Sequence, residues 1–196
     1  MKLLIGSDIH GDRQATERLI SAYHHHHCDY LICLGDLLNH GPRNKIPKHY
    51  DPQAVAELLN EYCDELLVVR GNCDSEVDQM LCKFPMLSDY QQLLTAQRRI
   101  FLTHGHIYRP NNLPLLKSGD LFVSGHTHIP VANCGDDGIY RLNPGSVAIA
   151  RDDWPESYAL LDEQRMQVCH LIEHQLLIEC VFADKHKKTV KARTDN

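Results

Sequence analysis

The chain opens on a short apolar run that ends abruptly in a small residue, an acid and a histidine: Lys2-Leu3-Leu4-Ile5-Gly6-Ser7-Asp8-Ile9-His10-Gly11-Asp12. An apolar run of this length bounded by Gly and Ser predicts a buried β-strand. Asp8 and His10 follow at the carboxyl end of that strand, and Gly11 allows a sharp turn after them. An Asp and a His two residues apart are common by chance. The pattern gains weight because the chain repeats it.

Four more apolar runs end in the same kind of polar sequence. They are Tyr30–Leu34 before Gly35-Asp36, Glu65–Val69 before Arg70-Gly71-Asn72, Arg99–Leu102 before Thr103-His104-Gly105-His106, and Leu121–Ser124 before Gly125-His126-Thr127-His128. Helical patterns separate the early runs, over residues 12–23 and from Asp51-Pro52 onward. Ser75 followed by Asp78 predicts the start of a short third helix.

From residue 131 onward the chain consists of short β-like segments separated by turns. These segments cover residues 131–133, 138–142, 147–150, 158–162, 166–172 and 176–182. Strands that alternate with helices early and follow one another later predict a mixed α/β fold with two packed sheets. We expect a single domain over residues 1–184 and a polar, basic, disordered tail over residues 185–196.

The composition excludes several classes of function. With 196 residues and 43% hydrophobic content, the chain can bury a sizeable core as one domain. The formal charge of −6 argues against a general nucleic-acid binder, and no apolar run approaches the roughly 20 residues of a membrane span. The eight cysteines include no C-x-x-C spacing, which predicts free thiols in a reducing, cytoplasmic setting.

Four consecutive histidines, His24–His27, invite a metal-binding interpretation. We expect them instead to end the first helix, because adjacent side chains on a helix point in different directions. A role in metal storage is disfavoured for a second reason: a storage site does not need polar loops after five strands.

The polar side chains that follow the five predicted strands comprise two carboxylates, one amide and four imidazoles. They are Asp8, His10, Asp36, Asn72, His104, His126 and His128. Ligands of α/β sheets gather at the carboxyl ends of the strands, so these loops can converge on one point. The set exceeds the needs of one four-coordinate ion and matches two ions that share a carboxylate. Mixed nitrogen and oxygen donors suit Mn²⁺, Fe²⁺, Ni²⁺ or Zn²⁺, and two such ions about 3.5–4 Å apart can clamp a phosphate.

These motifs resemble those of the calcineurin-like metallophosphoesterase superfamily. The resemblance rests on Asp8-Ile9-His10-Gly11, Gly35-Asp36, Gly71-Asn72, Thr103-His104-Gly105-His106 and Gly125-His126-Thr127-His128. Three further motifs bring the chain closer to the small bacterial YfcE-type phosphodiesterases: Gly41-Pro42-Arg43, Gly71-Asn72-Cys73-Asp74 and Asn143-Pro144-Gly145-Ser146. The likeness extends to about Phe182 and implies a four-layer α/β/β/α sandwich of two mixed β-sheets flanked by helices.

The resemblance also implies how the ligands divide between two divalent ions. One ion is expected on Asp8, His10, Asp36 and His128, and the other on Asp36, Asn72, His104 and His126, so that Asp36 bridges them. Similar enzymes are usually active with Mn²⁺, which is the first choice here; Ni²⁺, Fe²⁺ and Zn²⁺ are alternatives. The implied activity is phosphodiester hydrolysis by attack of a metal-bridging hydroxide, with His10, Asp36 and Asn72 as catalytic residues.

One position departs from the family pattern. Many members carry a histidine directly after the motif asparagine, where this chain has Cys73. A neutral thiol is a poor substitute for an imidazolium as a charge-stabilising donor or general acid, so we expect good leaving groups to be favoured over alkyl esters. Alternatively, Cys73 is only a small loop residue. Further candidates for substrate contacts are Asn39, His40, Arg43 and His106.

Other functions stay open at this point. A phosphomonoesterase or a cyclic-nucleotide phosphodiesterase would use the same metals, although Cys73 favours diesters. A retromer subunit of similar architecture works as a non-catalytic scaffold after losing part of its metal site, whereas all seven ligand positions match here. We expect a small-molecule phosphodiester substrate, no nucleic-acid or membrane partner, and a homo-oligomer, either a dimer or a tetramer.

Overall fold

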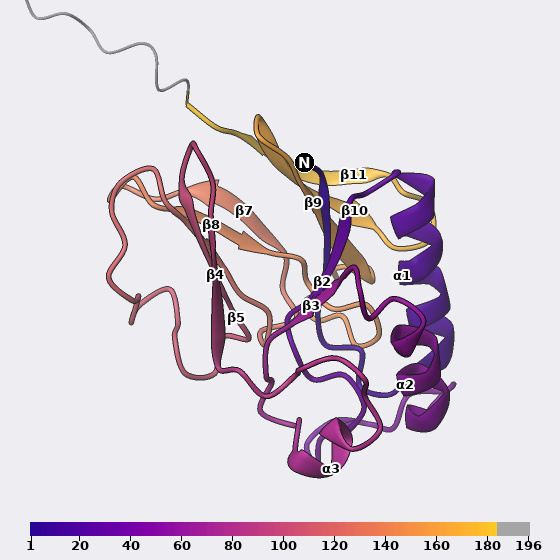
Figure 1. Ribbon diagram of the computed structural model, residues 1–196. Coiled ribbons are helices and arrows are strands. Elements are labelled where there is room, and N and C mark those ends of the chain that lie inside the picture. Colours follow the sequence, from indigo (N-terminus) through magenta and orange to yellow (C-terminus); the bar gives the residue numbers. More distant parts are fainter. Residues whose placement is uncertain (184–196) are drawn as a thin grey trace, which may run out of the picture.

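Two mixed β-sheets pack face to face in the structure, a computed structural model that describes residues 1–183 (Figure 1). The six-stranded sheet has the order β11 (Leu176–Val181), β10 (Arg165–His170), β9 (Ser157–Leu161), β1 (Leu3–Gly6), β2 (Tyr30–Cys33) and β3 (Leu66–Val68). The five-stranded sheet has the order β4 (Tyr90–Leu94), β5 (Arg99–Thr103), β6 (Leu121–Val123), β8 (Tyr140–Asn143) and β7 (Val131–Cys134). The predicted α/β class with two packed sheets is confirmed.

Each sheet combines parallel and antiparallel pairs. Strands β1, β2 and β3 are parallel, as are β5, β6 and β8. The neighbours β9, β10 and β11 join the first sheet antiparallel, and β4 and β7 close the second in the same way. The parallel strands therefore send their carboxyl ends, and the polar loops that follow, to one edge of each sheet.

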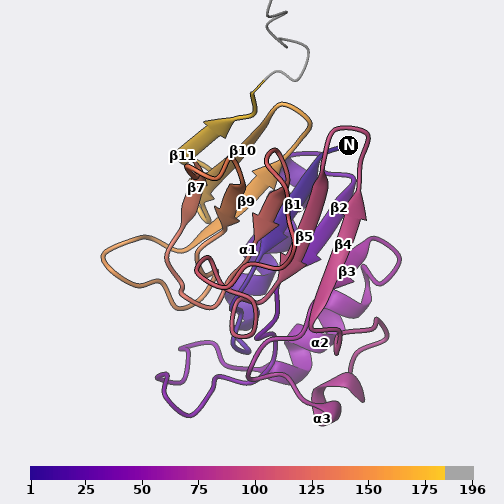
Figure 2. The same cartoon turned by 90° about the vertical axis from the view of Figure 1, so that its left-hand side faces the viewer.

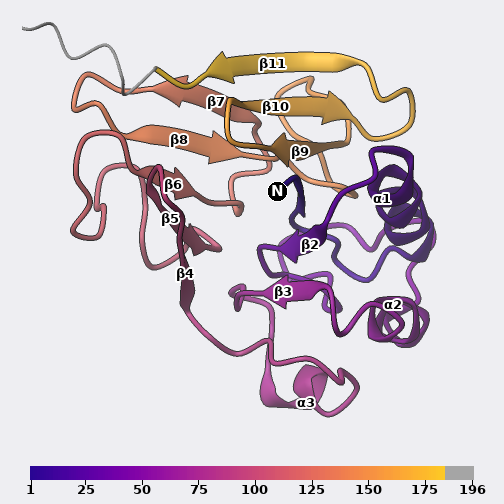
Figure 3. The same cartoon turned by 45° about the horizontal axis from the view of Figure 1, so that its top comes forward.

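Two helices cover the outer face of the six-stranded sheet (Figure 3). Helix α1 (Arg13–His25) begins after Asp12, whose side chain accepts a hydrogen bond from the backbone N–H of Ala15 at 2.9 Å. Helix α2 (Pro52–Asn60) begins after Asp51 with proline at its first position, as predicted. The short α3 (Glu76–Gln79) starts at the predicted capping box of Ser75 and Asp78.

Alternation along the strands divides the core into layers. In β1, Leu4 packs toward the helices, whereas Leu3 and Ile5 pack between the two sheets. In β5, Leu102 faces the space between the sheets and Phe101 faces outward. Fully burying one large apolar side chain contributes about 1.5–3 kcal/mol. Because a shift of one residue would exchange the two faces, this pattern fixes the register of the strands that carry the polar loops.

The outer face of the five-stranded sheet is covered by an irregular segment (Figure 2). Tyr108, Leu113 and Leu116 from the connection between β5 and β6 pack against Phe101 and Phe122. Residues 104–120, all within the described part of the chain, contain no helix. The flanking layer on this side is therefore irregular chain, unlike the helical layer over the other sheet.

Two segments differ from the sequence-based expectation. Residues 147–150 form a turn and no strand, because the Ser146 hydroxyl accepts hydrogen bonds from the backbone N–H groups of Ala148 and Ile149 at 3.2 and 2.8 Å. Strand β4 was not predicted. It is an edge strand that pairs only with β5, and two of its five residues are glutamines, so its apolar signal is weak.

Other expectations have simple outcomes. His24 and His25 end α1 and His26 is its C-cap, as predicted. All eight cysteines are free thiols, also as predicted. The described residues contain no helix that is both long enough and apolar enough to cross a bilayer. The tail predicted over residues 185–196 lies outside the described residues.

Candidate metal centre

The structure brings all seven predicted ligands together at one end of the sandwich. They come from loops after β1 (Asp8, His10), β2 (Asp36), β3 (Asn72), β5 (His104) and β6 (His126, His128). Loops from both sheets thus contribute to one cluster. The expectation that polar side chains converge at the carboxyl ends of these strands is met.

Five of these residues have a left-handed backbone conformation. The φ angles are 57° for Asp8, 51° for His10, 54° for Asp36, 67° for His126 and 62° for His128. Asp and His tolerate this region better than most residues, but each occurrence still costs on the order of 1–3 kcal/mol. Strain of this kind collects at functional sites, where the surrounding structure holds it in place.

Two glycines allow the ligand loops to approach each other closely. A Cβ atom on Gly71 would lie 2.1 Å from Asp36 Oδ1, and one on Gly125 would lie 1.9 Å from Ser7 Oγ. No larger residue fits at either position without moving a neighbouring loop. The glycines that precede Asn72 and His126 therefore let backbone pack directly against the residues around the ligands.

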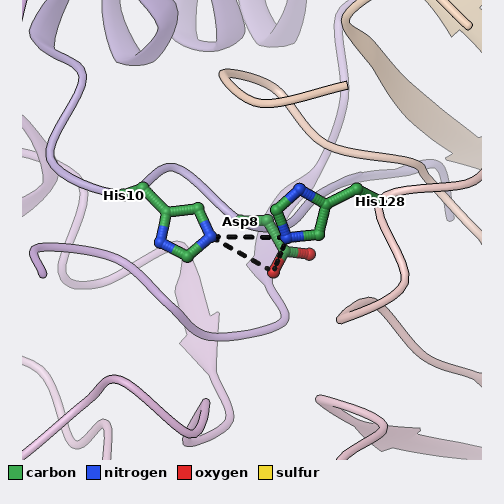
Figure 4. Close-up of side chains that lie close together, drawn as sticks. All are labelled: Asp8, His10 and His128. Carbon is green, nitrogen blue, oxygen red and sulfur yellow. Dashed lines mark hydrogen bonds and ion pairs between the residues drawn. The ribbon is translucent and has the colours of Figure 1, made fainter. Parts of the chain in front are cut away.

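One group of donors consists of Asp8, His10 and His128, which point toward one another (Figure 4). Asp8 Oδ1 lies 3.2 Å from His128 Nε2 and 3.7 Å from His10 Nε2, and the two nitrogens are 3.4 Å apart. Donors bound to one tetrahedral ion at ~2.0–2.1 Å lie about 3.4 Å from one another. The three atoms therefore have the spacing of ligands to a common ion.

Hydrogen bonds fix the orientation of these two imidazoles. The Nδ1 atom of His10 is 3.0 Å from the carbonyl oxygen of Asn39, and that of His128 contacts the carbonyl oxygen of Ile149. A carbonyl only accepts, so each Nδ1 carries a proton and donates it. Each Nε2 lone pair is then free to face the centre, which is the arrangement of metal-binding histidines.

A second group of donors surrounds His104. Its Nε2 lies 3.4 Å from Asp36 Oδ2, 3.1 Å from Asn72 Oδ1 and 3.2 Å from His126 Nδ1. Its Nδ1 donates a hydrogen bond to the carbonyl oxygen of Leu34 at 2.7 Å. Asp36 Oδ2 is also 3.8 Å from His10 Nε2, so this oxygen lies between the two groups.

The carboxylate of Asp8 shows that the donors fit a cation. It is fully buried, and its Oδ2 accepts hydrogen bonds from Ser7 Oγ at 2.7 Å and the His126 backbone N–H at 3.0 Å. Its Oδ1 has no hydrogen-bond partner in the described structure. An unpaired buried acceptor costs about 1–3 kcal/mol, and more when it is charged. The Nε2 atoms of His128 and His10 lie 3.2 and 3.7 Å from it, so a divalent ion there would satisfy these three atoms.

Charge and burial oppose each other at this centre. Burial disfavours the ionised form of Asp8, but the charge of His104 and the nearby imidazoles of His10 and His128 outweigh it and hold the pKa of Asp8 well below its usual value. Burial also disfavours protonated His104, yet Asp8 and Asp36 raise its pKa to about 9. A positive charge therefore stabilises the buried carboxylates, and a proton on His104 supplies it when no metal ion is bound.

Asp74 joins two ligand loops, a role that the sequence did not reveal. Its buried carboxylate accepts three backbone hydrogen bonds, from Asp36 at 2.8 Å, Gly71 at 2.7 Å and Leu37 at 2.9 Å. Asp36 follows β2 and Gly71 follows β3, so one side chain fixes the spacing of both loops. The only signal in the sequence was an acid two residues after the motif asparagine.

A pocket of about 330 Å³ adjoins the ligands. It is lined by Asp36, Gly41, Pro42, Arg43, Asn44, Asn72, Cys73, His126, His128 and Arg151. Of the five residues predicted to contact substrate, Arg43 and Cys73 line this pocket. Burial and the neighbouring Asp36 carboxylate raise the pKa of Cys73 to about 12, so its side chain is a neutral thiol near neutral pH.

The other three predicted substrate contacts do not line the pocket. Asn39 accepts the hydrogen bond of His10 through its backbone, and its side chain accepts one from Gly41 N at 2.8 Å. The ring of His40 packs edge-on against the ring of Tyr50 at a centroid distance of 5.4 Å. The ring of His106 lies 5.4 Å from that of His104. Of the three, Asn39 contacts a ligand through a hydrogen bond and His106 through its ring.

The chain is similar to known phosphoesterases. A sequence profile of the calcineurin-like phosphoesterase superfamily domain matches residues 1–166. Phosphodiesterase YfcE of Escherichia coli K12 is 48% identical over 179 residues, which cover 91% of this chain and 97% of that protein. The solved structure of that phosphoesterase matches with a TM-score of 0.91 and 46% identity, over 93% of this chain and 100% of the other.

A more distant structure shares the fold alone. Vacuolar Protein Sorting 29 from Cryptosporidium parvum matches with a TM-score of 0.64 over 93% of this chain and 98% of that chain, at 19% identity. Likeness at this level of identity says nothing about activity.

Proposed function

This chain belongs to the calcineurin-like phosphoesterase superfamily, and we propose that it is a phosphodiesterase that uses two divalent metal ions. The observation that carries the proposal is the buried Asp8 Oδ1, which has no hydrogen-bond partner and faces three imidazole nitrogens. The predicted enzyme class agrees with the similarity to a named phosphodiesterase over nearly the full length of both chains.

We assign Asp8, His10, Asp36 and His128 to one ion and Asp36, Asn72, His104 and His126 to the other. Two short distances support this division: Asp8 Oδ1 lies 3.2 Å from His128 Nε2, and Asp36 Oδ2 lies 3.4 Å from His104 Nε2. The position of Asp36 Oδ2 between His10 and His104 supports a bridging role. Mn²⁺ is the first choice of ion, and Ni²⁺, Fe²⁺ and Zn²⁺ are alternatives that the same nitrogen and oxygen donors accommodate.

When bound, the two ions supply an activated water molecule and offset negative charge on the phosphate. The protein holds the donors in fixed orientations. Asp36 is held through Oδ1, which accepts a hydrogen bond from Cys73 N at 2.8 Å, and this leaves Oδ2 for the centre. Asn72 presents Oδ1 toward the centre while its Nδ2 contacts Cys73 Sγ at 3.2 Å. We propose His10, Asp36 and Asn72 as the catalytic residues on these grounds.

Cys73 supports a preference among substrates. Its thiol lines the pocket, stays neutral and carries no positive charge toward a phosphate. Leaving groups that depart without a proton, such as nitrophenolate, are therefore favoured over alkoxides. A diester with one aromatic arm fits this requirement better than an alkyl phosphomonoester does.

The remaining expectations stay predictions. The pocket volume fits a small-molecule diester, and the net charge of −6 disfavours nucleic-acid polymers. We propose one domain over residues 1–184, a cytoplasmic location, and a homo-oligomer that is a dimer or a tetramer. Light scattering coupled to size-exclusion chromatography gives the molar mass that tests the last point.

The test is hydrolysis of bis(p-nitrophenyl) phosphate and p-nitrophenyl phosphate by metal-stripped protein to which Mn²⁺ is returned. We expect manganese-dependent cleavage of the diester, well above that of the monoester and lost in Asp36→Asn. The matched control is Asp136→Asn, an exposed carboxylate on the turn before β8. Equal or better cleavage of the monoester would overturn the diester preference. Absence of cleavage with any of the four ions would point to a non-catalytic scaffold.

A further inference from the structure

Most arginines in residues 1–183 form an ion pair with a carboxylate of the protein. Six form ion pairs with carboxylates: Arg13, Arg18, Arg70, Arg99, Arg141 and Arg165. Arg98 lies over the ring of Phe182 at 3.4 Å, and Arg109 donates to the backbone oxygen of His106. The two others in this part of the chain are Arg43 and Arg151, and both line the pocket beside the metal centre.

Arg43 and Arg151 reach the pocket from different loops. Arg43 lies between β2 and α2, and Arg151 lies between β8 and β9. Figure 2 shows these two loops extending from the same side of the molecule. Arg151 Nη2 donates a hydrogen bond to Asn44 Oδ1 at 3.2 Å, and Asn44 Nδ2 donates to the carbonyl oxygen of His40 at 2.9 Å. The contact holds Arg151 against the loop that carries Arg43.

Neither arginine is neutralised by the described part of the protein. Asp152 and Asp153 follow Arg151 directly, yet they form no ion pair with it and do not line the pocket. Asp36 is the one carboxylate in the pocket lining, and it faces the histidines of the metal centre. One pocket thus carries two exposed guanidinium groups that pair with no carboxylate of the described residues.

We propose that Arg43 and Arg151 form a second anion-binding subsite, and that the preferred substrates are phosphodiesters in which one arm carries a further anionic group. The inference rests on the proposed function, because the metal centre is taken to hold the scissile phosphate. A guanidinium binds phosphate or carboxylate through a planar pair of N–H donors. The second anion is therefore a phosphate or a carboxylate that these two side chains bind in the pocket beside the metal ligands.

The activity test uses matched p-nitrophenyl diesters. One has a plain butyl arm, and the others carry a phosphate or a carboxylate at the end of the same arm. With Mn²⁺-loaded protein, we expect kcat/KM to be about tenfold higher for at least one anionic arm, and the two anionic substrates distinguish the phosphate from the carboxylate. Arg43→Gln and Arg151→Gln should each bring the ratio of kcat/KM for the anionic arm to kcat/KM for the butyl arm to within about twofold of one. Arg165→Gln, a matched change on β10, should keep the wild-type ratio.

A second readout does not depend on catalysis. Trp154 is the single tryptophan of the chain, and its backbone N–H donates to the carbonyl oxygen of Arg151 at 3.1 Å. Inorganic phosphate titrated into metal-stripped protein should change Trp154 fluorescence in a saturable way. Arg151→Gln should weaken this binding at least tenfold, and Arg165→Gln should leave it unchanged.

Three results would overturn the subsite. The first is equal kcat/KM for the neutral and anionic arms, and the second is a preference for the anionic arm that survives both Arg→Gln changes. The third is an equal loss of kcat/KM for all diesters in the variants, which would place the arginines on the scissile phosphate. Failure of the proposed function looks different. In that case the wild-type protein cleaves no diester, while the fluorescence titration still reports whether the arginine pair binds phosphate.

Discussion

Replacing Asp74 with asparagine should separate the two loops that deliver Asp36 and Asn72. The Asp74 carboxylate accepts hydrogen bonds from the backbone N–H groups of Asp36, Gly71 and Leu37, and its residue is only 9% exposed. Two of these bonds end on Oδ2 and one on Oδ1. An asparagine can keep the two bonds to Asp36 and Gly71 through its amide oxygen. Its NH₂ group then faces the Leu37 N–H, so two donors meet and the third bond is lost.

The magnitude follows from these contacts. One hydrogen bond to a charged group contributes about 1.5–3 kcal/mol, and Asp74→Asn loses one and leaves a buried N–H unpaired. Removing a buried charge offsets part of this loss. We expect the free energy of unfolding to fall by about 2 kcal/mol, which corresponds to roughly 4–8 °C in Tm for a chain of this size. Mn²⁺ affinity should fall as well, because both ligand loops lose a shared anchor.

Urea unfolding of the metal-stripped proteins measures the first effect and isothermal titration with Mn²⁺ the second. Asp136→Asn is the control, since in the described structure this exposed carboxylate makes no hydrogen bond or ion pair. It should match the wild type in both measurements. If the free energy of unfolding of Asp74→Asn lies within about 0.5 kcal/mol of the wild-type value, the range of ordinary surface changes, then Asp74 does not join the loops.

Three further predictions concern the same centre. Gly71→Ala should abolish Mn²⁺ binding measured by calorimetry, because its Cβ would lie 2.1 Å from Asp36 Oδ1; binding at wild-type affinity would contradict the packing. The pKa of His104 is raised to about 9, so its proton stabilises the metal-free fold below about pH 6.5, and that contribution is lost as the pH rises through 9. Mn²⁺ affinity should rise over the same window, since the metal displaces this proton, and a flat affinity from pH 6.5 to 9 would refute it. Cys73→His should narrow the kcat/KM gap between bis(p-nitrophenyl) phosphate and a dialkyl phosphate at least tenfold, because an imidazolium can protonate an alkoxide and the thiol, with a pKa of about 12, cannot. An unchanged gap would show that residue 73 is only a small loop residue.

The ligand cluster could be predicted because the pattern that marks each ligand lies within a few neighbouring residues. Each ligand follows an apolar run within a few residues, and parallel strands bring their carboxyl ends to one edge of a sheet. Asp8 and His10 illustrate this, since β1 pairs in parallel with β2 and its loop meets the loop that carries Asp36. Sequence spacing alone was enough to propose that these side chains converge.

The supporting residues could not be predicted, because their roles depend on contacts across the fold. Ser146 follows a turn late in the chain, yet its hydroxyl donates to the carbonyl oxygen of Asp8 at 2.9 Å. Arg151 reaches the pocket only because its loop packs against Asn44. Arg151 has no pattern of its own in the sequence, and Ser146 belongs to a motif that does not reveal this contact. Asn39 is a further case: its contact with substrate stays a prediction, and the structure adds that its backbone carbonyl accepts a hydrogen bond from His10.

The most direct test of the central claim is a Mn²⁺ titration of metal-stripped protein, with the rate of bis(p-nitrophenyl) phosphate hydrolysis measured at each step. The proposed assignment, with Asp36 Oδ2 shared between the two ions, predicts that activity rises until two equivalents of Mn²⁺ per chain have been added and then stays level. Asp36→Asn should show no plateau at two equivalents. A plateau at one equivalent, or full activity before any metal is added, would contradict a centre of two ions.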